Sequence, residues 1–540
     1  MKTLSAQLAK KRLQQDEECA LIDVREQEEF SRGHPLLASC LSLSRLELEA
    51  EALIPCKKTT VIVTDSGVEP FSSPRAECAA KRLTEAGYAD VIVLAGGVEA
   101  WKKAGYLLFT GVGALSKAFG ELVEVGLDTK RLDPEEVKHL LDAKTNTRVV
   151  DVRPWDEYHT MNIPGSVNLP GCEVTYRIAD AVPDPETLIV INCAGRTRSI
   201  IGAQTLINAG LPNKVAALKG GTMNWSLAGL ELEYGSVRVS PPPSPAAFAI
   251  ARRRAAQIAK KYNIAFADAA TLAQWQAQAQ ERTLYLFDIR QPEEFMAGHI
   301  PGSRNAPGGQ LVQATDEYAT VRKARFVLVD DTEVRAIMTA HWLKQMGLEQ
   351  VFVLKGGLAA ADLLVKGSAT IFAPNSGFVP PKPDTLTPWQ LRALTATEPL
   401  PLILNIGGSR KHRAGHIPGA AWVMRAYLER ARAACPDARN IVITSDSQEH
   451  AAFAWKDARV LWQNAQILCL TGGASAWEQA GLPLEQGMDK AFSQEEDIWY
   501  KPYEDIHANR EAMSGYFAWE SKLVEQVRKD GSVTFALAAE

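Results

Sequence analysis

The most restrictive feature of this 540-residue sequence is a pattern that occurs four times. Each copy begins with a short apolar strand that ends in an acid or its amide, at Asp23, Asp151, Asp288 and Asn405. Each copy closes with another apolar stretch and a glycine pair, whose first members are Gly96, Gly220, Gly356 and Gly472. These glycines are 124, 136 and 116 residues apart, a spacing typical of whole domains rather than of solenoid repeats. We therefore expect four consecutive domains.

Within each copy, strands rich in Val, Ile and Leu alternate with helical stretches such as residues 73–88 and 199–210. Continuous apolar strands separated by helices are typical of a parallel sheet with helices on both faces, so an α/β fold is predicted for each domain. The glycine pairs are expected at strand-to-helix turns that need a positive φ or a close backbone approach. A tryptophan four residues after the pair in three copies is expected to anchor the core.

Domain limits follow from the repeats and from two proline-rich segments, 236–248 and 371–384, which we expect to be semi-extended spacers. The predicted domains are residues 1–110, 126–236, 262–370 and 384–488. Residues 489–540 form a tail rich in aromatic residues. Such a tail is expected to pack back on the domains or to form a homo-oligomer contact, because a solvated segment rarely has this composition.

Composition excludes several classes of function. A net charge of −5 makes nucleic acid an unexpected ligand. No apolar run is long enough to cross a membrane and the N-terminus has no apolar signal core, so we expect a cytoplasmic protein. The eight cysteines include no CxxC pair and no Cys/His cluster at zinc spacing, which argues against a disulfide framework and a metal site. We expect no cofactor, and a cysteine that matters should act as a thiol.

One cysteine, Cys193, follows a predicted buried strand that ends at Asn192, and a helix is predicted to begin near Ser199. A thiol at such a turn faces backbone N–H groups and the positive end of a helix, which lower thiol pKa and bind anions. We expect Cys193 to be the catalytic nucleophile. The residues expected to bind an anionic substrate are Ala194, Gly195, Arg196, Thr197, Arg198 and Ser199. The alternative is that Cys193 is an ordinary buried thiol.

The predicted chemistry is sulfur transfer by a covalent, ping-pong mechanism. The thiolate attacks the outer sulfur of a donor such as thiosulfate, sulfite leaves, and a thiophilic acceptor later removes the sulfur from the Cys193 persulfide. The loop N–H groups are expected to stabilise the terminal sulfur of the persulfide. Asp151 and Arg153 belong to a DVR string that recurs in other copies. We therefore expect this pair to brace the turn beside the loop rather than to contact substrate.

The strings DVRPWDEY, IPGSVNLP, NCAGRTRS and LKGGTMNW, in that order, resemble a rhodanese domain, the sulfurtransferase module. The resemblance covers nearly the whole chain as four tandem rhodanese-like domains and is strongest in the second. It implies a sulfurtransferase of the thiosulfate:cyanide type, with a small anionic sulfur donor and cyanide, a thiol or a protein as acceptor. Phosphatases that resemble rhodaneses have a longer C-x5-R loop, whereas here Arg198 stands five residues after Cys193. Thiosulfate is favoured over 3-mercaptopyruvate, and a persulfide carrier or scaffold remains an alternative.

The other three copies have no cysteine at the position of Cys193, where Asp65, Asp330 and Ser445 stand instead. We expect these copies to be inactive, with no catalytic base near the substituted residues. Tandem rhodaneses often pair an inactive domain with an active one and place the active site near their cleft. The resemblance therefore implies a cleft between the first two domains, with the second pair as a scaffold. Cys172 is left open as a resolving thiol.

Overall fold

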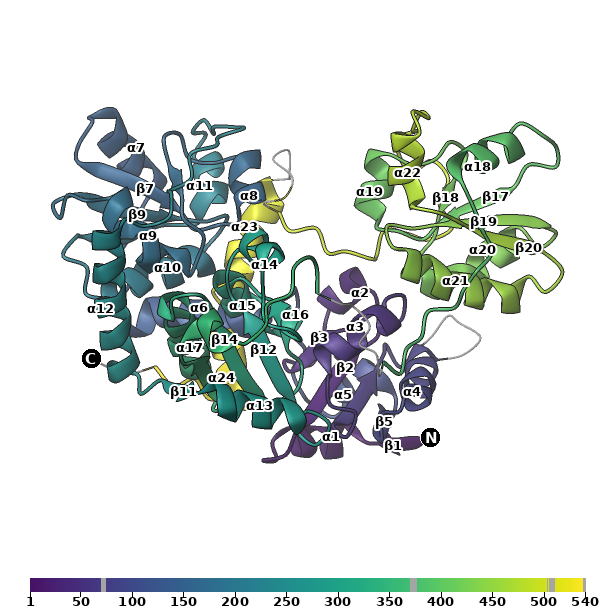
Figure 1. Ribbon diagram of the computed structural model, residues 1–540, viewed down its shortest axis with the longest axis horizontal. Coiled ribbons are helices and arrows are strands. Elements are labelled where there is room, and N and C mark those ends of the chain that lie inside the picture. Colours follow the sequence, from purple (N-terminus) through teal and green to yellow (C-terminus); the bar gives the residue numbers. More distant parts are fainter. Residues whose placement is uncertain (69–73, 370–375, 503, 505–509, 538–540) are drawn as a thin grey trace.

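The computed structural model describes residues 1–68, 74–369, 376–502, 504 and 510–537 (Figure 1). It contains four parallel sheets of five strands, and the strand order is the same in each. In the first domain the order is β1-β5-β4-β2-β3. The predicted α/β class and the four tandem domains are confirmed. Residue 370 at the end of the third domain, residues 371–375 of the second proline-rich segment and residues 503, 505–509 and 538–540 of the tail lie outside the described residues.

The first and second domains occupy the N-terminal half of the chain and are joined by one helix. The first comprises β1 (Lys2–Leu4), α1 (Ala6–Leu13), β2 (Cys19–Asp23), α2 (Gln27–Ser31), β3 (Ala38–Cys40), α3 (Leu46–Leu53), β4 (Thr60–Thr64), α4 (Arg75–Glu85), β5 (Asp90–Leu94) and α5 (Gly97–Lys103). Helix α6 (Ala114–Gly126) leads to the second, with β6 (Arg131–Leu132), α7 (Pro134–Asp142), β7 (Thr147–Asp151), α8 (Trp155–Thr160), β8 (Val167–Asn168), α9 (Glu173–Ala181), β9 (Leu188–Asn192), α10 (Thr197–Asn208), β10 (Val215–Leu218) and α11 (Gly221–Leu227).

The third and fourth domains repeat this order of elements. Helix α12 (Pro245–Lys261) leads to β11 (Ala265–Ala267), α13 (Ala269–Ala277), β12 (Leu284–Asp288), α14 (Pro292–Ala297), β13 (Arg304–Asn305), α15 (Gly308–Gln313), α16 (Thr315–Tyr318), β14 (Arg325–Val329), α17 (Val334–Gln345), β15 (Val351–Leu354) and the 3₁₀ helix η1 (Gly357–Ala360). The fourth domain has β16 (Thr385–Leu386), α18 (Pro388–Leu394), β17 (Leu402–Asn405), α19 (Ser409–Ala414), β18 (Ala421–Trp422), η2 (Arg425–Tyr427), α20 (Leu428–Ala434), β19 (Asn440–Thr444), α21 (Gln448–Leu461), β20 (Gln466–Leu470) and α22 (Gly473–Gln479). Helices α23 (Arg510–Glu520) and α24 (Leu523–Asp530) belong to the tail.

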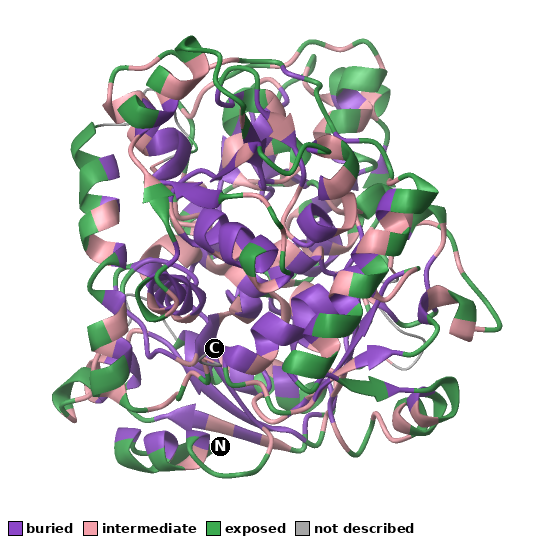
Figure 2. Cartoon of the chain, turned by 90° about the vertical axis from the view of Figure 1, so that its left-hand side faces the viewer, coloured by how far each residue is buried: buried purple, intermediate pink, exposed green. Residues whose placement is uncertain are grey.

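Helices cover both faces of each sheet, because successive strand residues point to opposite sides. On β7, Val149 packs in a cluster with Trp225 of α11, whereas Val150 packs in another cluster with Leu206 of α10. The three predicted core tryptophans are buried (Trp101, Trp225 and Trp477). Figure 2 shows buried residues gathered in the strands and the inner helix faces, with exposed residues on the outer helix faces.

The first proline-rich segment has no helix over residues 236–244, as expected of a semi-extended spacer, but it is helical from Pro245 onward. Val239 forms a parallel bridge with Asn168 at the edge of the second sheet. The segment then continues into α12, whose N-cap Ser244 accepts a hydrogen bond from the N–H of Ala247 and whose first residue is Pro245. A serine N-cap followed by proline at the first helical position favours helix initiation, and this signal outweighs the proline-rich composition.

The second domain packs against the third domain. Glu173 of α9 and Arg335 of α17 form a fully buried ion pair at 2.7 Å. The backbones approach most closely at Gly171, where a β-carbon would lie 2.4 Å from Cα of Gly309. The equivalent face of the first domain packs against the fourth domain. The expected cleft between domains 1 and 2 is therefore wrong, because the second domain presents this face to the third.

The tail passes over all four domains (Figure 1). Ala491 forms a bridge with Trp422 of the fourth domain, and the N–H of Trp499 donates to Gln27 of the first. Helix α24 then packs on α6, and the N–H of Ala536 donates to the carbonyl of Gln345 in the third domain. Over its described residues the tail packs back on the domains, which is one of the two arrangements expected from its composition.

Candidate active site

The loop that carries Cys193 connects β9 to α10 in the second domain. Strand β9 lies between β7 and β10 in the sheet, and its last residue, Asn192, pairs with Asp151 at the end of β7. Helix α10 begins at Thr197, two residues before the expected start at Ser199. Ligands of parallel α/β sheets bind beyond the carboxyl ends of the strands, and the loop of residues 193–199 is in that place.

Groups that stabilise a negative sulfur surround Cys193, but its burial opposes them. Burial raises the pKa of the Cys193 thiol, whereas the Arg198 guanidinium, the hydroxyl and N–H of Ser199 and the N–H of Gly195 lower it. The side chain of Cys193 is 1% exposed. The expectation of a lowered thiol pKa is therefore wrong for this arrangement, because desolvation outweighs the loop dipoles and the arginine.

The glycine pair and the residue after it contact the backbone of the loop that carries Cys193. Thr222 donates to the carbonyl oxygen of Cys193 from its N–H at 2.8 Å and from its hydroxyl at 3.0 Å. Gly221 has φ +55°, and a β-carbon there would lie 2.3 Å from the same oxygen. The predicted reasons for glycine, a positive φ and a close backbone approach, both hold.

The second glycine of each pair identifies the equivalent loop position in all four domains. A β-carbon on Gly97, Gly221, Gly357 or Gly473 would lie 2.2–2.5 Å from one carbonyl oxygen of the facing loop. Those oxygens belong to Asp65, Cys193, Asp330 and Ser445. The structure thus places these four residues at the same point of the fold, as the comparison of the four sequence copies predicts.

Asp151 and Arg153 form a buried brace beside the loop. The Arg153 Nη2 lies 2.8 Å from Asp151 Oδ2 and donates to the carbonyl of Met161 at 2.6 Å. The Asn192 amide donates to Asp151 at 2.7 Å, which ties the brace to the residue before Cys193. The same ion pair occurs in the first and third domains, as Asp23–Arg25 and Asp288–Arg290. Because the first and third domains lack the cysteine and form the same ion pair, this pair stabilises the fold and does not serve catalysis specifically.

Both loop arginines are held by carboxylates in the structure. The Arg196 guanidinium lies 2.6 Å from both Glu121 and Glu124 of α6. Arg198 pairs with Glu157 of α8 at 2.7 and 2.8 Å. An anion that enters the loop therefore meets arginines whose charge is already partly compensated. Sequence reasoning missed Glu121 and Glu124, because they come from a connecting helix outside the repeated pattern.

In the equivalent loop of the third domain, backbone N–H groups bind a carboxylate side chain. The Asp330 carboxylate accepts hydrogen bonds from the N–H groups of Thr332 at 3.2 Å, Glu333 at 2.5 Å and Arg335 at 2.9 Å. In the first domain, Asp65 likewise accepts from two backbone N–H groups, at 2.9 Å each. These loops are N–H cradles that a side-chain carboxylate fills. At the position of Cys193 these two loops have a carboxylate and no sulfur nucleophile.

The fourth domain differs from the expectation that no base accompanies Ser445. The Ser445 hydroxyl lies 3.1 Å from Nδ1 of His450, and Nε2 of His450 lies 3.1 Å from the carbonyl oxygen of Ser44 in the first domain. A carbonyl only accepts, so Nε2 carries the proton and Nδ1 accepts from Ser445. Burial lowers the His450 pKa to about 3. This weakly basic, neutral ring joins the fourth domain to the first.

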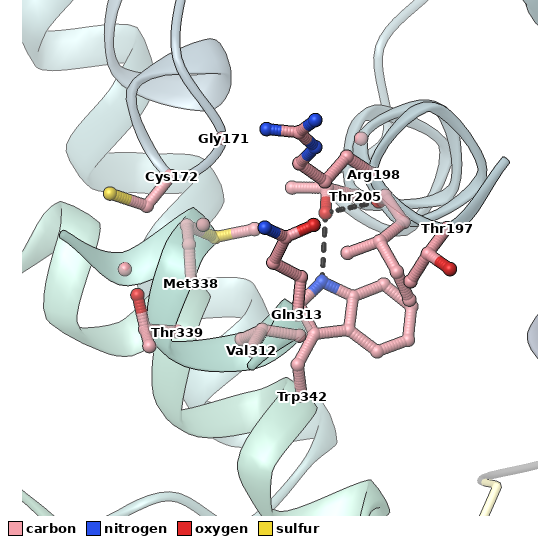
Figure 3. Close-up of a pocket in the computed structure, with 14 residues that line it drawn as sticks. Gly171, Cys172, Thr197, Arg198, Thr205, Val312, Gln313, Met338, Thr339 and Trp342 are labelled. Atoms are coloured by element: carbon pink, nitrogen blue, oxygen red, sulfur yellow. Dashed lines mark hydrogen bonds between the residues drawn. The ribbon is translucent and has the colours of Figure 1, made fainter. Parts of the chain in front are cut away.

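Cys172 lies at the interface with the third domain, at the N-terminus of α9. Its thiol donates to the carbonyl of Ile289 at 3.6 Å, and burial raises its pKa to about 12. It lines a narrow cavity together with Arg198, Thr205 and Trp342 (Figure 3). The Trp342 indole donates to the Thr205 hydroxyl at 2.8 Å across this cavity. The high pKa disfavours a thiolate at Cys172.

The described part of the chain contains no group of three or more His, Cys, Asp or Glu side chains arranged to hold a metal ion. Within the same residues, no helix has the length and apolar character needed to span a bilayer.

Comparisons with known proteins support the repeat structure. A family model described as "Rhodanese-like domain" matches residues 5–104, 133–228 and 268–362. The matched regions are the first three domains, and the fourth shares their strand order. The chain is similar to the solved structure of thiosulfate sulfurtransferase from Pseudomonas aeruginosa, at 44% identity and a TM-score of 0.94 over 100% of both chains.

Two curated proteins are similar over single domains. The uncharacterized protein YqhL of Bacillus subtilis is 37% identical over 87 residues, which are 16% of this chain and 68% of YqhL. The adenylyltransferase and sulfurtransferase UBA4 of Candida albicans is 30% identical over 106 residues, covering 18% of this chain and 24% of UBA4.

Proposed function

The chain belongs to the family of rhodanese-like domains and is a sulfurtransferase of that type, and we propose that it works through a persulfide on Cys193. The proposed donor is a small anion, with thiosulfate favoured. The proposed acceptors are cyanide, a thiol or a sulfur-accepting protein. The observation that carries this proposal is that four equivalent loops are present and only the loop of the second domain has a thiol in its N–H cradle.

The third domain supports an anionic intermediate at this place. Its loop holds the Asp330 carboxylate on three backbone N–H groups. In the second domain the N–H groups of Gly195 and Ser199 face the sulfur of Cys193 and favour its negative form. Fixed N–H dipoles that stabilise a carboxylate also stabilise a thiolate and the terminal sulfur of a persulfide.

The reaction balances in two steps. First, the Cys193 thiol loses its proton and the thiolate forms a bond to the outer sulfur of thiosulfate. The S–S bond of the donor breaks and sulfite leaves with the electron pair. Second, an acceptor such as cyanide attacks the terminal sulfur, the persulfide bond breaks, and the Cys193 thiolate is regenerated with thiocyanate as product.

Residues of the second domain receive separate roles in this scheme. Cys193 is the nucleophile, and the backbone from Ala194 to Ser199 forms the cradle for the donor and the persulfide. Arg198 is assigned to stabilise the negative charge on the sulfur, because its guanidinium is the main group that lowers the Cys193 pKa. Asp151 and Arg153 hold the end of β7 beside the loop.

Thiosulfate is favoured over 3-mercaptopyruvate because a compact dianion gains more from two adjacent arginines than a keto acid does. The similarity to a protein named thiosulfate sulfurtransferase points in the same direction. We also propose a cytoplasmic location, since all eight cysteines are free thiols and reducing compartments keep them so.

A turnover assay with thiosulfate and cyanide tests the proposal. Repeated production of thiocyanate by the purified chain, lost in Cys193→Ser, is the expected result. Transfer that stops after one sulfur per chain would instead identify a persulfide carrier that waits for a protein partner. Equal activity in Cys193→Ser would contradict the proposed nucleophile.

A further inference from the structure

The tail helix α23 packs directly on the loop that carries Cys193. Met513 and Tyr516 of α23 form one buried cluster with Met223 of α11, and Phe517 packs against it. A β-carbon on Gly195 would lie 3.0 Å from Met223 Cε, 3.7 Å from Tyr516 Cε1 and 4.0 Å from Phe517 Cε1. The aromatic face of α23 therefore covers the loop.

Phe517 also covers the double-glycine turn that supports the loop. A β-carbon on Gly220 would lie 3.0 Å from Phe517 Cζ. Gly195 is not among the glycines with a positive φ, so its backbone conformation does not require glycine. The approach of Met223, and the rings of Tyr516 and Phe517 just beyond it, leave little room for a side chain at position 195.

Contacts at both ends hold α23 in this position. Arg510, at its start, donates to the carbonyl oxygens of Ser226 and Leu227 at the end of α11. Near its other end, the ring of Trp519 lies within 2.5 Å of the β-carbon position of Gly111. The ring of Tyr516 lies 5.2 Å from that of Trp519. The cover over Cys193 is thus a packed part of the fold.

We propose that Tyr516 and Phe517 determine substrate specificity by forming the roof of the Cys193 site. This inference rests on the proposed function and specifies its substrate class. The roof admits compact donors and acceptors, such as thiosulfate and cyanide, and excludes molecules with a bulky group next to the reacting sulfur. Removing an aromatic ring opens space above Gly195 and Gly220, so bulky molecules gain access while compact ones gain little.

Thiol labelling tests the roof without requiring sulfur transfer. The rates of Cys193 modification by iodoacetamide and by a fluorescein maleimide are measured by peptide mass mapping, since other cysteines also react. The variants are Phe517→Ala and the milder Phe517→Leu. The matched control is Phe248→Ala, which removes a half-buried phenyl ring from α12 that packs against Tyr176 of α9. Phe517→Ala should raise the bulky-to-small rate ratio by roughly tenfold or more, with Phe517→Leu between.

Donor selectivity tests the catalytic consequence. Benzenethiosulfonate donates its outer sulfur to the Cys193 thiolate and releases benzenesulfinate, so it differs from thiosulfate by a bulky leaving group. The ratio of kcat/KM for benzenethiosulfonate to that for thiosulfate should rise in Phe517→Ala and Tyr516→Ala, and stay unchanged in Phe248→Ala. Thermal melting of each variant confirms that it is folded, and Phe517→Leu replaces any variant that is not.

The two measurements separate the possible failures. A changed labelling ratio with no transfer from any donor would support the roof and refute the proposed function. Normal turnover with both ratios unchanged in folded Phe517 variants would refute the roof. An equal rise for small and bulky reagents would also overturn it, because the ring would then limit general access rather than size.

Discussion

The β-carbon position of Gly221 lies 2.3 Å from the carbonyl oxygen of Cys193, so the glycine pair and the nucleophile loop are in direct backbone contact. Any side chain at position 221 would displace the loop that holds the sulfur. The equivalent contact in the other three domains spans 2.2–2.5 Å. The fold therefore repeats the same contact between glycine and loop four times and supplies the thiol once.

Gly221→Ala should lower both stability and sulfur transfer. The new methyl group would meet backbone at a position with φ +55°, which adds a clash to conformational strain of about 1–2 kcal/mol. Gly229→Ala is the matched control, since Gly229 has φ +74° but nothing within 4 Å of its β-carbon position. Chemical denaturation and turnover should show a smaller stability loss and normal activity in the control. Equal effects of the two changes would mean that strain alone, and not contact with the loop, matters.

Asp330→Ala should convert the third domain's loop into an empty anion site. Three backbone N–H groups would lose their acceptor, at a cost of roughly 2–4 kcal/mol for a buried, charge-assisted set. Added thiosulfate or sulfate should restore part of the melting temperature in the variant and have less effect on the native chain. If anions stabilise both proteins equally, the cradle does not bind external anions.

Arg196→Ala should raise the donor concentration needed for persulfide formation more for thiosulfate than for 3-mercaptopyruvate. A charge-assisted contact contributes on the order of 1.5–3 kcal/mol, and the variant also removes the arginine that pairs with Glu121 and Glu124, of which Glu124 keeps its ion pair with Arg131. Adding Glu121→Gln and Glu124→Gln to the variant separates a lost contact from new repulsion. An equal loss for both donors would remove the support for thiosulfate.

Glu26→Gln should stabilise the protein at pH 8 but not at pH 4. Burial raises the pKa of Glu26 from 4.5 to about 7, so the folded state binds this proton more tightly than the unfolded state. The stability that the protonated group contributes is complete below pH 4.5 and is lost as the pH rises to about 7. Glutamine keeps the oxygen that accepts from Ser44 and avoids the buried charge, worth up to about 3 kcal/mol.

Melting temperatures at the two pH values test this prediction. Glu77→Gln, a change of an exposed glutamate, is the control and should give the same small difference at both. A gain for Glu26→Gln at pH 4 as large as at pH 8 would contradict the assignment of the effect to this carboxyl group.

The repeated pattern was sufficient to predict the four sheets, the glycine turns and the position of Cys193. Each of those features depends on residues close together in sequence, such as the apolar strand before Cys193 and the helix after it. His450 was also within reach, because it stands only five residues after Ser445, in the first turn of α21. Its orientation could not be predicted, because the Nε2 atom of its ring forms a hydrogen bond to a carbonyl oxygen of the first domain.

Contacts between segments that are distant in the sequence could not be predicted from it. Glu121 belongs to a connecting helix and Phe517 to the tail, and no periodicity in the sequence links either of them to the loop. The raised pKa of Cys193 follows from the burial of its side chain. The N–H groups and Arg198 act in the predicted direction, but the desolvation that outweighs them comes from the packing of the whole domain and is not visible in the loop sequence.

The intact mass of the protein after incubation with thiosulfate shows whether a persulfide forms. We expect that the native chain gains one sulfur atom, that peptide mapping places it on Cys193, and that cyanide removes it. Cys193→Ser should gain none, because serine cannot form a persulfide. Sulfur bound to Cys193→Ser, or a native chain that stays unmodified by thiosulfate and 3-mercaptopyruvate alike, would contradict the account.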